Sequence, residues 1–285
     1  MNKGKAPRLL SKVKRVAREK GIRYVVLAGI RKTRNRLAVS FWYNYYRIFK
    51  SRRKLRFQQK EYKYFYHKYN TTWRNERVVE IPIVWDIVKA CKENILEVGN
   101  VLSHYFAVNH VIVDKYEKAE GVITEDVTEI RLPKKYDLIV SISTLEHVGW
   151  DENQSDHKIL HEHEKIIHAI AKLKEHLTPK GKIVVTLPLG YNPDLDALLK
   201  NGKIRFDRLF CLKRISRDNR WIETDWKNVE DSKFNSPFAF ANGLVIGVIE
   251  NQPQNLPRST ITLKLHFSPH PNFSHEPLLK SSTHN

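Results

Sequence analysis

The feature that most constrains the fold is an alternation of short apolar segments with segments of helical periodicity, which begins at Asn94. Such alternation is typical of βαβ units around a parallel sheet. We therefore predict an α/β fold with a Rossmann-like, mostly parallel sheet. The expected strands cover residues 94–98, 111–113, 122–124, 136–141, 182–187, 209–215 and 244–250, and the expected helices cover residues 82–92, 159–177 and 194–200.

Acidic residues follow these strands at the points where a ligand is expected. In an open parallel sheet, ligands bind beyond the carboxyl ends of the strands. Glu97 and Gly99 end the first strand, Asp114 follows the second, and Asp126 follows the third. A carboxylate after the second strand is placed to accept the ribose hydroxyls of a nucleoside, and one after the third can meet an exocyclic amine.

Five segments of this region together resemble the class I S-adenosylmethionine-dependent methyltransferases. They are ILEVGN, VIVDKYE, ITEDVTEI, KKYDLIVSISTLEHVG and LTPKGKIVVTLPLG, and the resemblance runs from about Trp73 to Glu250. It implies a seven-stranded sheet with an antiparallel last strand, and S-adenosyl-L-methionine as the cofactor. It also implies the cofactor contacts, which are Glu97 and Gly99 at the methionine side, Asp114 at the ribose, Asp126 and Val127 flanking the adenine, and Ser141 to Ser143 beside the sulfonium.

The loop after the first expected strand departs from the pattern of that family. The family repeats glycine at alternate positions there, whereas here Gly99 is followed by the sequence NVLS. A Cβ at positions 101 and 103 crowds the approach of the backbone to a ligand. Either the loop takes another path or the cofactor binds poorly, and a catalytically silent scaffold remains an alternative.

His147 is the candidate general base. It follows the fourth expected strand, beside which the resemblance places the reacting methyl group, and imidazole titrates near neutral pH. Glu146 can orient His147 or cap a helix, and His147 itself can be a structural histidine at the start of a helix. Tyr191 lies in a Pro- and Gly-rich loop after the fifth strand. It is a candidate contact for the acceptor, or it is simply part of the turn.

Two clusters of charged and imidazole side chains are expected to be structural. The histidines at 157, 161, 163 and 168 lack the HExxH spacing of a zinc site, so we predict no metal site. For Arg74, Glu76, Arg77 and Glu80 the default is an ion-pair network, and recognition of a polar acceptor is the alternative.

Positive charge is concentrated in the first part of the chain. Residues 1–70 hold 22 of the 50 Lys and Arg but only two acidic residues, and the remaining chain is nearly neutral. Apolar residues recur there at helical spacing, which predicts two or three basic amphipathic helices. The aromatic residues at 42, 43, 45 and 46 favour contact with an anionic membrane surface. RNA binding, and packing against the body or a second subunit, are the alternatives.

We predict three parts, which are a basic helical extension (1–70), a methyltransferase-like domain (71–251) and a weakly ordered tail (252–285). The two cysteines are far apart, which favours a reducing compartment over a disulfide framework. No segment has the ~20 apolar residues of a membrane span, and no signal-peptide pattern is present. The expected location is cytoplasmic, peripheral at the inner face of a membrane.

These features predict an S-adenosylmethionine-dependent methyltransferase that acts on a small-molecule or glycan/lipid-linked acceptor at a membrane surface. The segment WRNERVVEIP adds a weaker resemblance to members that act on glycans or lipid-linked products. The alternative assignment as an RNA methyltransferase is supported only by the basic extension, residues 1–70. Nucleic acid is therefore the less favoured partner. Neither the acceptor atom nor the oligomeric state follows from the sequence.

Overall fold

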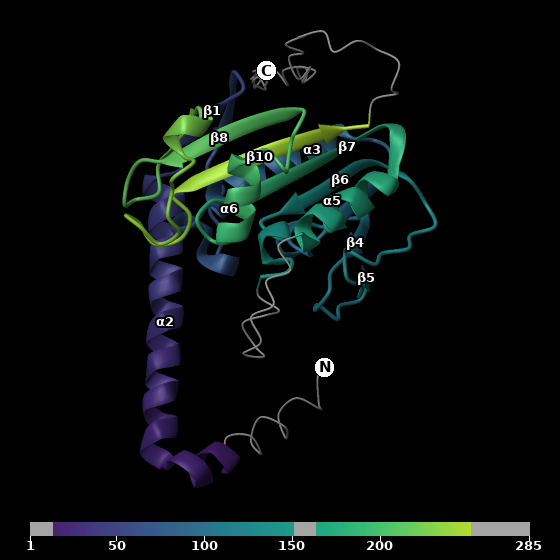
Figure 1. The fold of residues 1–285 in the computed structure, drawn as a ribbon. Helices are drawn as coiled ribbons and strands as arrows, with labels where there is room; N and C mark the ends of the chain where they lie inside the picture. Colours follow the sequence, from purple (N-terminus) through teal and green to yellow (C-terminus); the bar gives the residue numbers. More distant parts are fainter. Residues whose placement is uncertain (1–13, 151–163, 252–285) are drawn as a thin grey trace, which may run out of the picture. The chain divides into compact units, whose positions relative to one another are not determined.

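The computed structural model describes residues 14–150 and 164–251, and the predicted tail lies outside them. Its main feature is one eight-stranded sheet (Figure 1). In spatial order the strands are β5 (Val122–Ile123), β4 (Val111–Val113), β3 (Ile95–Val98), β6 (Tyr136–Ile142), β7 (Leu177–Pro188), β10 (Gly243–Glu250), β8 (Arg208–Arg214) and β9 (Trp221–Thr224).

The strand directions confirm the predicted Rossmann-like fold. The strands β5, β4, β3, β6 and β7 are parallel, and β10 runs antiparallel between β7 and β8. The count of seven strands is corrected to eight, because Trp221–Thr224 pairs with the edge of β8 as an additional antiparallel strand. The strand β7 also begins at Leu177, five residues before the expected start.

Helices cover the two faces of the sheet (Figure 1). On one face, α3 (Arg77–Ala90) buries apolar side chains such as Ile81 and Val84 against β6 and its neighbours. On the other face lie α5 (Lys165–Glu175) and α6 (Pro193–Lys200). The side chain of Asn192 caps α6 by accepting the backbone N–H groups of residues 194 and 195, and Pro193 suits the first helical position because it needs no N–H partner there.

A two-stranded hairpin completes the core on the α3 face. Its strands are β1 (Lys54–Phe57) and β2 (Lys60–Lys63), and each buries alternate side chains. Leu55, Phe57 and Tyr62 pack in the same cluster as the apolar face of α3. The helix α2 therefore ends at Phe49, before a hairpin that packs with the body, whereas the extension expected from the sequence runs to residue 70.

The extension itself is helical, but it is not amphipathic. Residues 14–20 are helical, Gly21 adopts a left-handed φ of 84°, and α2 runs from Ile22 to Phe49 without a buried residue. Residues three or four positions apart share a helix face, and Arg23, Leu27, Ile30 and Arg34 follow that spacing. Cationic and apolar side chains are thus mixed on one face of α2. The prediction of amphipathic helices, with the two kinds of side chain on opposite faces, is therefore wrong for α2.

The last turns of α2 contact the body through aromatic rings. Tyr43 and Tyr46 each lie 6.2 Å, centroid to centroid, from the buried Trp73, and Tyr46 also contacts Tyr66 at 5.4 Å. Phe41, Trp42, Ile48 and Phe49 remain exposed. The aromatic residues of α2 therefore divide into a set that docks the helix and a set that faces solvent. No helix in the described ranges is long and apolar enough to cross a membrane.

Candidate active site

Glu97, at the end of β3, is fully buried and holds the loop that follows. Its Oε1 accepts the backbone N–H groups of Val101 and Leu102 at 2.9 and 2.7 Å, and its Oε2 lies 2.7 Å from Nε2 of His110. Both carboxylate oxygens are thus engaged within the protein. The loop turns at once into a short 3-10 helix, Leu102–His104, in place of a glycine-rich turn.

Gly99 brings this loop against the loop that follows β6. Its φ is 84°, in the left-handed region that glycine adopts without strain. A Cβ at this position would lie 2.2 Å from Oγ1 and 2.9 Å from Cβ of Thr144. The space left by Gly99 is therefore filled by Thr144, which follows the fourth expected strand and was not assigned a cofactor contact.

Asp114 follows β4 and is half-buried beside the first loop. Its Oδ2 accepts the Asn100 N–H at 3.1 Å, and its Oδ1 accepts the N–H groups of Tyr116 and Glu117 at 2.8 Å each. Burial on its own would raise the pKa of Asp114, but these backbone hydrogen bonds outweigh it and hold the pKa below its ordinary value. Asp114 is therefore an ionised acceptor at the carboxyl edge of the sheet.

Asp126 and Val127 are less suited to contact a ligand. Asp126 pairs with Lys115 at 2.8 Å and accepts the N–H and hydroxyl of Thr128. Burial opposes ionisation, yet these partners lower the pKa of Asp126 to about 2. Val127 packs in the core on the α5 side. Both residues thus have structural partners of their own.

The end of β6 carries two buried hydroxyls with different environments. The Oγ of Ser141 is buried and has no hydrogen-bond partner among the described residues. Ser143 has a φ of 38°, donates its N–H to Thr186 at 3.0 Å, and donates its hydroxyl to Oε1 of Glu80 at 2.5 Å. These two hydrogen bonds of Ser143 connect the end of β6 to β7 and to α3.

Arg77, whose side chain is 11% exposed, pairs with one of several buried carboxyl groups near this end of β6. Its guanidinium contacts Oε2 of Glu80 at 3.2 Å and donates to the carbonyl oxygen of Ile142 at 2.9 Å. Glu76, also buried, accepts the N–H of Ala241 at 3.3 Å. The ion-pair network expected for this segment is confirmed for Arg77 and Glu80.

Glu146 and His147 lie together on the next turn, Leu145–His147. Glu146 is 1% exposed, and its Oε2 has no hydrogen-bond partner within the described part of the chain. Burial raises the pKa of Glu146 well above its ordinary value, and the positive charge of Arg77 opposes that shift only in part. Burial therefore favours the protonated form of this carboxyl group over the ionised form.

His147 is more exposed and faces the loop after β7. Its side chain is 42% exposed, and its Nε2 lies 3.6 Å from Oε1 of Glu146. Its ring centroid is 4.8 Å from that of Tyr191. Asn192, not predicted as a site residue, donates its side-chain amide to the carbonyl oxygen of Glu146 at 2.8 Å. The three predicted residues Glu146, His147 and Tyr191 are thus brought together.

The predicted absence of a metal site involves histidines at 157, 161 and 163, which lie outside the described residues. His168 is exposed on α5. Within residues 14–150 and 164–251, no group of three metal-binding side chains is found.

Comparison with solved structures finds distant likenesses to methyltransferases. The N-methyltransferase NodS from Bradyrhizobium japonicum WM9, in complex with S-adenosyl-L-homocysteine, has 12% identity and a TM-score of 0.38, over 62% of this chain and 87% of that chain. An rRNA methylase from Streptococcus thermophilus has 10% identity and a TM-score of 0.36, over 61% and 97%. An S-adenosylmethionine-dependent methyltransferase from Clostridium acetobutylicum ATCC 824 has 10% identity and a TM-score of 0.31, over 60% and 89%.

No protein family and no curated protein matches the sequence. At these identities and TM-scores, the structural likenesses carry no argument about activity. The fold assignment therefore rests on the strand order and directions described above.

The contact between Gly99 and Thr144 predicts a large loss of stability in Gly99→Ala. A left-handed φ costs a non-glycine residue about 1–2 kcal/mol, and the clash with Thr144 should add about 1–3 kcal/mol. Gly121→Ala is the matched control, because Gly121 has a φ of 80° and nothing within 4 Å of the added Cβ. Urea denaturation measures both. Equal losses in the two variants would contradict the close packing of these loops.

The raised pKa of Glu146 predicts a specific pH dependence of stability. Above the ordinary value of 4.5, the folded protein keeps a proton that the unfolded chain has released, so the free energy of unfolding falls as pH rises. Glu146→Gln stays neutral and should lose this contribution. Urea denaturation between about pH 5 and 8 should show a shallower decline for the variant, by up to about 1.4 kcal/mol per pH unit. Parallel curves for the two proteins would mean that Glu146 is ionised.

Proposed function

We propose that this protein is an S-adenosylmethionine-dependent methyltransferase. The observation that carries the proposal is the arrangement at the carboxyl edge, where an ionised Asp114 after β4 meets the loop after β3. The antiparallel β10 between β7 and β8 adds support, because the resemblance of the sequence motifs implies an antiparallel last strand.

The residues present fit the cofactor in part. Asp114 accepts three backbone N–H groups but is only half-buried, so its remaining acceptor position can still receive a ribose hydroxyl. The Ser141 hydroxyl and Oε2 of Glu146 are buried polar atoms without described partners. Glu97 is different, because it is fully buried and both its oxygens are occupied by the first loop and His110, so we assign it a positioning role. Bound S-adenosylmethionine would supply the electrophilic methyl group.

The chemistry we propose for the chain itself is proton removal from the acceptor. Transfer of a methyl group to a hydroxyl or to an N–H group gives a neutral product only when the acceptor atom loses its proton, which His147 can take at Nε2. Glu146, whose pKa is raised by burial and whose Oε1 lies 3.6 Å from Nε2 of His147, can hydrogen-bond the ring or the acceptor. Tyr191 packs against His147 and lies where the acceptor would enter.

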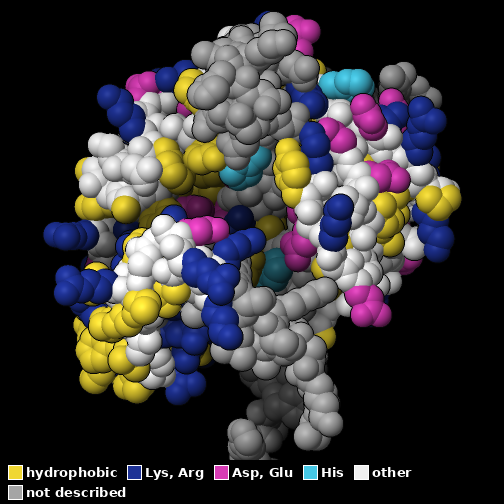
Figure 2. All heavy atoms as spheres, turned by 90° about the horizontal axis from the view of Figure 1, so that it is seen from below, with side chains coloured by type: hydrophobic (Ala, Val, Ile, Leu, Met, Phe, Trp, Pro, Cys, Tyr) yellow, Lys and Arg dark blue, Asp and Glu magenta, His cyan; other side chains and the backbone are white. Residues whose placement is uncertain are grey.

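We propose a membrane surface as the place of action and a small-molecule or glycan/lipid-linked acceptor. Support comes from α2, where Phe41, Trp42 and Ile48 are exposed among cationic side chains. Hydrophobic and Lys or Arg side chains lie side by side in the left part of Figure 2. Such a mixed surface suits the headgroup region, where rings meet the acyl boundary and cations meet lipid phosphates.

Two other functions stay open as alternatives. An RNA methyltransferase is supported by the charge of α2 alone. A catalytically silent scaffold is supported by the internal use of Glu97 and Asp126 and by Thr144, which fills the space beside Gly99.

Asp114→Asn should weaken binding of S-adenosylhomocysteine about tenfold or more, because a charged acceptor of the ribose hydroxyls is lost. Titration calorimetry with the full-length protein measures this. Asp231→Asn, an exposed carboxylate paired with Lys200, is the control and should bind as the wild type does. Absence of binding to the wild type at millimolar ligand would favour the scaffold.

His147→Asn should lower turnover about 10²–10⁴-fold with little change in cofactor binding, since a general base acts on the acceptor. The assay is methyl transfer from labelled S-adenosylmethionine, once an acceptor is identified. A loss below about threefold would leave His147 with a packing role only.

Replacement of Phe41, Trp42 and Ile48 by Ser should abolish binding to phosphatidylglycerol vesicles at low salt, because the exposed rings and aliphatic chains would no longer enter the headgroup region. Cosedimentation measures the bound fraction. A control triple replacement of exposed apolar residues on the body, at Tyr116, Leu209 and Ile222, should bind normally. If the wild type ignores such vesicles yet binds single-stranded RNA, the RNA methyltransferase becomes the better assignment.

A further inference from the structure

A pocket of about 400 Å³ lies where the end of α2 meets the hairpin and the turn between β8 and β9. Cationic side chains dominate its lining, and no carboxylate lines it. They are Lys50, Arg52, Arg53, Lys54 and Arg220.

Nearby carboxylates neutralise only part of this charge. Arg53 pairs with Asp218 and donates to the carbonyl oxygen of that residue at 2.7 Å, and Lys54 pairs with Glu61. Lys50, Arg52 and Arg220 have no carboxylate within 4 Å in the described part of the chain. The pocket thus carries an excess of about three positive charges.

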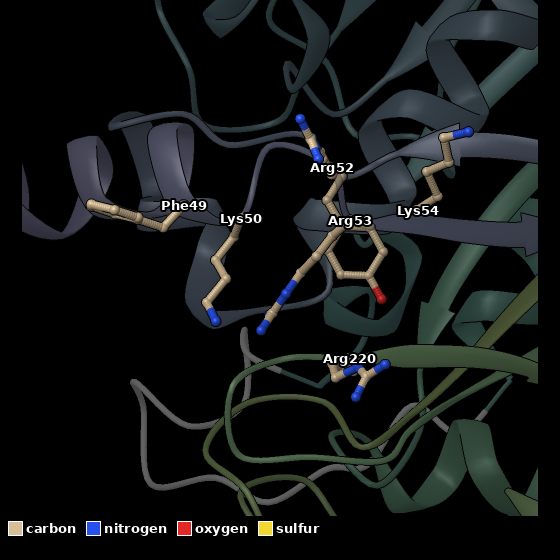
Figure 3. Close-up of a pocket in the computed structure, with 7 residues that line it drawn as sticks. Phe49, Lys50, Arg52, Arg53, Lys54 and Arg220 are labelled. Atoms are coloured by element: carbon tan, nitrogen blue, oxygen red, sulfur yellow. The ribbon is translucent and has the colours of Figure 1, made fainter.

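Two of these cations end close together, and a third lines the same pocket. Figure 3 shows Lys50 and Arg53 extending side by side from the end of α2 and the segment before β1, with Arg220 below them on the β8–β9 turn. Like charges repel, so this proximity raises the energy of the empty pocket. An anion bound beside the three groups would offset this repulsion. The guanidinium of Arg53 is already held in position by Asp218.

Tyr64 adds a neutral donor to the pocket. The residue is 9% exposed, and its hydroxyl accepts the backbone N–H of Trp221 at 2.7 Å. Because that bond uses the oxygen as an acceptor, the hydroxyl proton is left to donate, and no described residue accepts it. At the mouth, Phe49 lines the pocket and is 71% exposed, so an apolar group joined to the anion would find a partner there.

We propose that this pocket binds a phosphate group. Guanidinium and ammonium groups form short, charge-assisted hydrogen bonds with phosphate oxygens, and Arg can do so with two parallel bonds. The negative end of the α2 dipole, near Lys50, opposes an anion, but it amounts to about half a charge against the excess of cations. The inference does not depend on the methyltransferase proposal.

The phosphate has two possible sources, which share this chemistry. The β8–β9 turn leaves the sheet at the same edge as the end of β6, three strands away, or roughly 15 Å at the usual strand spacing. A phosphate-bearing soluble molecule can therefore reach the pocket along that edge. A lipid headgroup can reach it from the exposed end of α2.

Calorimetric titration of the full-length protein with pyrophosphate, a soluble probe, tests the site. The test variant is Lys50→Gln with Arg220→Gln, since neither side chain has a carboxylate partner. The matched control is Lys63→Gln with Arg217→Gln, which removes the same charge from the hairpin and the turn outside the pocket. We expect the test variant to bind about tenfold or more weakly and the control to bind within about twofold of the wild type. Thermal unfolding and circular dichroism verify that all three proteins are folded.

Vesicles of phosphatidylglycerol, with phosphatidylcholine as the uncharged comparison, form the second arm. Pocket-dependent binding of pyrophosphate alone supports a soluble phosphate ligand, and pocket-dependent binding of the anionic vesicles supports a headgroup. The proposal is overturned if neither probe binds the wild type, or if test and control variants lose binding equally, because the attraction would then be a property of net charge. Binding of S-adenosylhomocysteine is measured separately and bears only on the methyltransferase proposal.

Discussion

The buried guanidinium of Arg77 ties α3 to the end of β6, and the candidate site is built around that connection. It contacts Glu80 and the carbonyl oxygen of Ile142, while Glu80 in turn accepts the hydroxyl of Ser143. Loss of one partner of a buried ion pair typically costs about 3–5 kcal/mol, because the other charge remains uncompensated. The position of the β6 loop, and hence of Glu146 and His147, therefore depends on a helix that precedes the whole parallel sheet in the chain.

The acidic residues at the carboxyl edge of the sheet have two kinds of role: some hold the protein's own loops, and one is available to a ligand. Glu97 is fully buried against its own loop and His110, and Asp126 is paired with Lys115, whereas the half-buried Asp114 accepts backbone N–H groups and has no cationic partner within salt-bridge distance in the described part of the chain. Glu146 is the opposite case, because burial raises its pKa and favours the protonated form. Two carboxyl groups with opposite pKa shifts thus lie at the carboxyl edge of the sheet, an arrangement suited to a ligand with hydroxyls at one end and a reacting centre at the other.

At the surface, the end of α2 lies beside the basic pocket. Tyr43 and Tyr46 dock the helix on Trp73, which places the last residue of α2 beside the cations of the pocket. The exposed side chains Phe41, Trp42 and Ile48 then project from a helix whose end is anchored. An apolar surface and a basic pocket of about 400 Å³ in one place suit a ligand that is itself amphipathic.

The sequence by itself determined the strands, the order of the motifs and the segregation of charge. Apolar alternation and charge are local properties, so β3, β4, β6 and β10 appear within a residue or two of their expected positions. The packing of the β1–β2 hairpin with α3 depends on contacts that no local pattern shows. The mixed face of α2, in contrast, can be read from the spacing of its residues, so the prediction of an amphipathic helix was wrong on local grounds. Only the tertiary structure decided that the Glu97 carboxylate binds its own loop and His110, that Thr144 fills the space at Gly99, and that Lys50 and Arg220 line one pocket. The last two depend on residues distant in the chain, and the first depends on the path of the loop, so none of the three follows from local apolar and charge patterns.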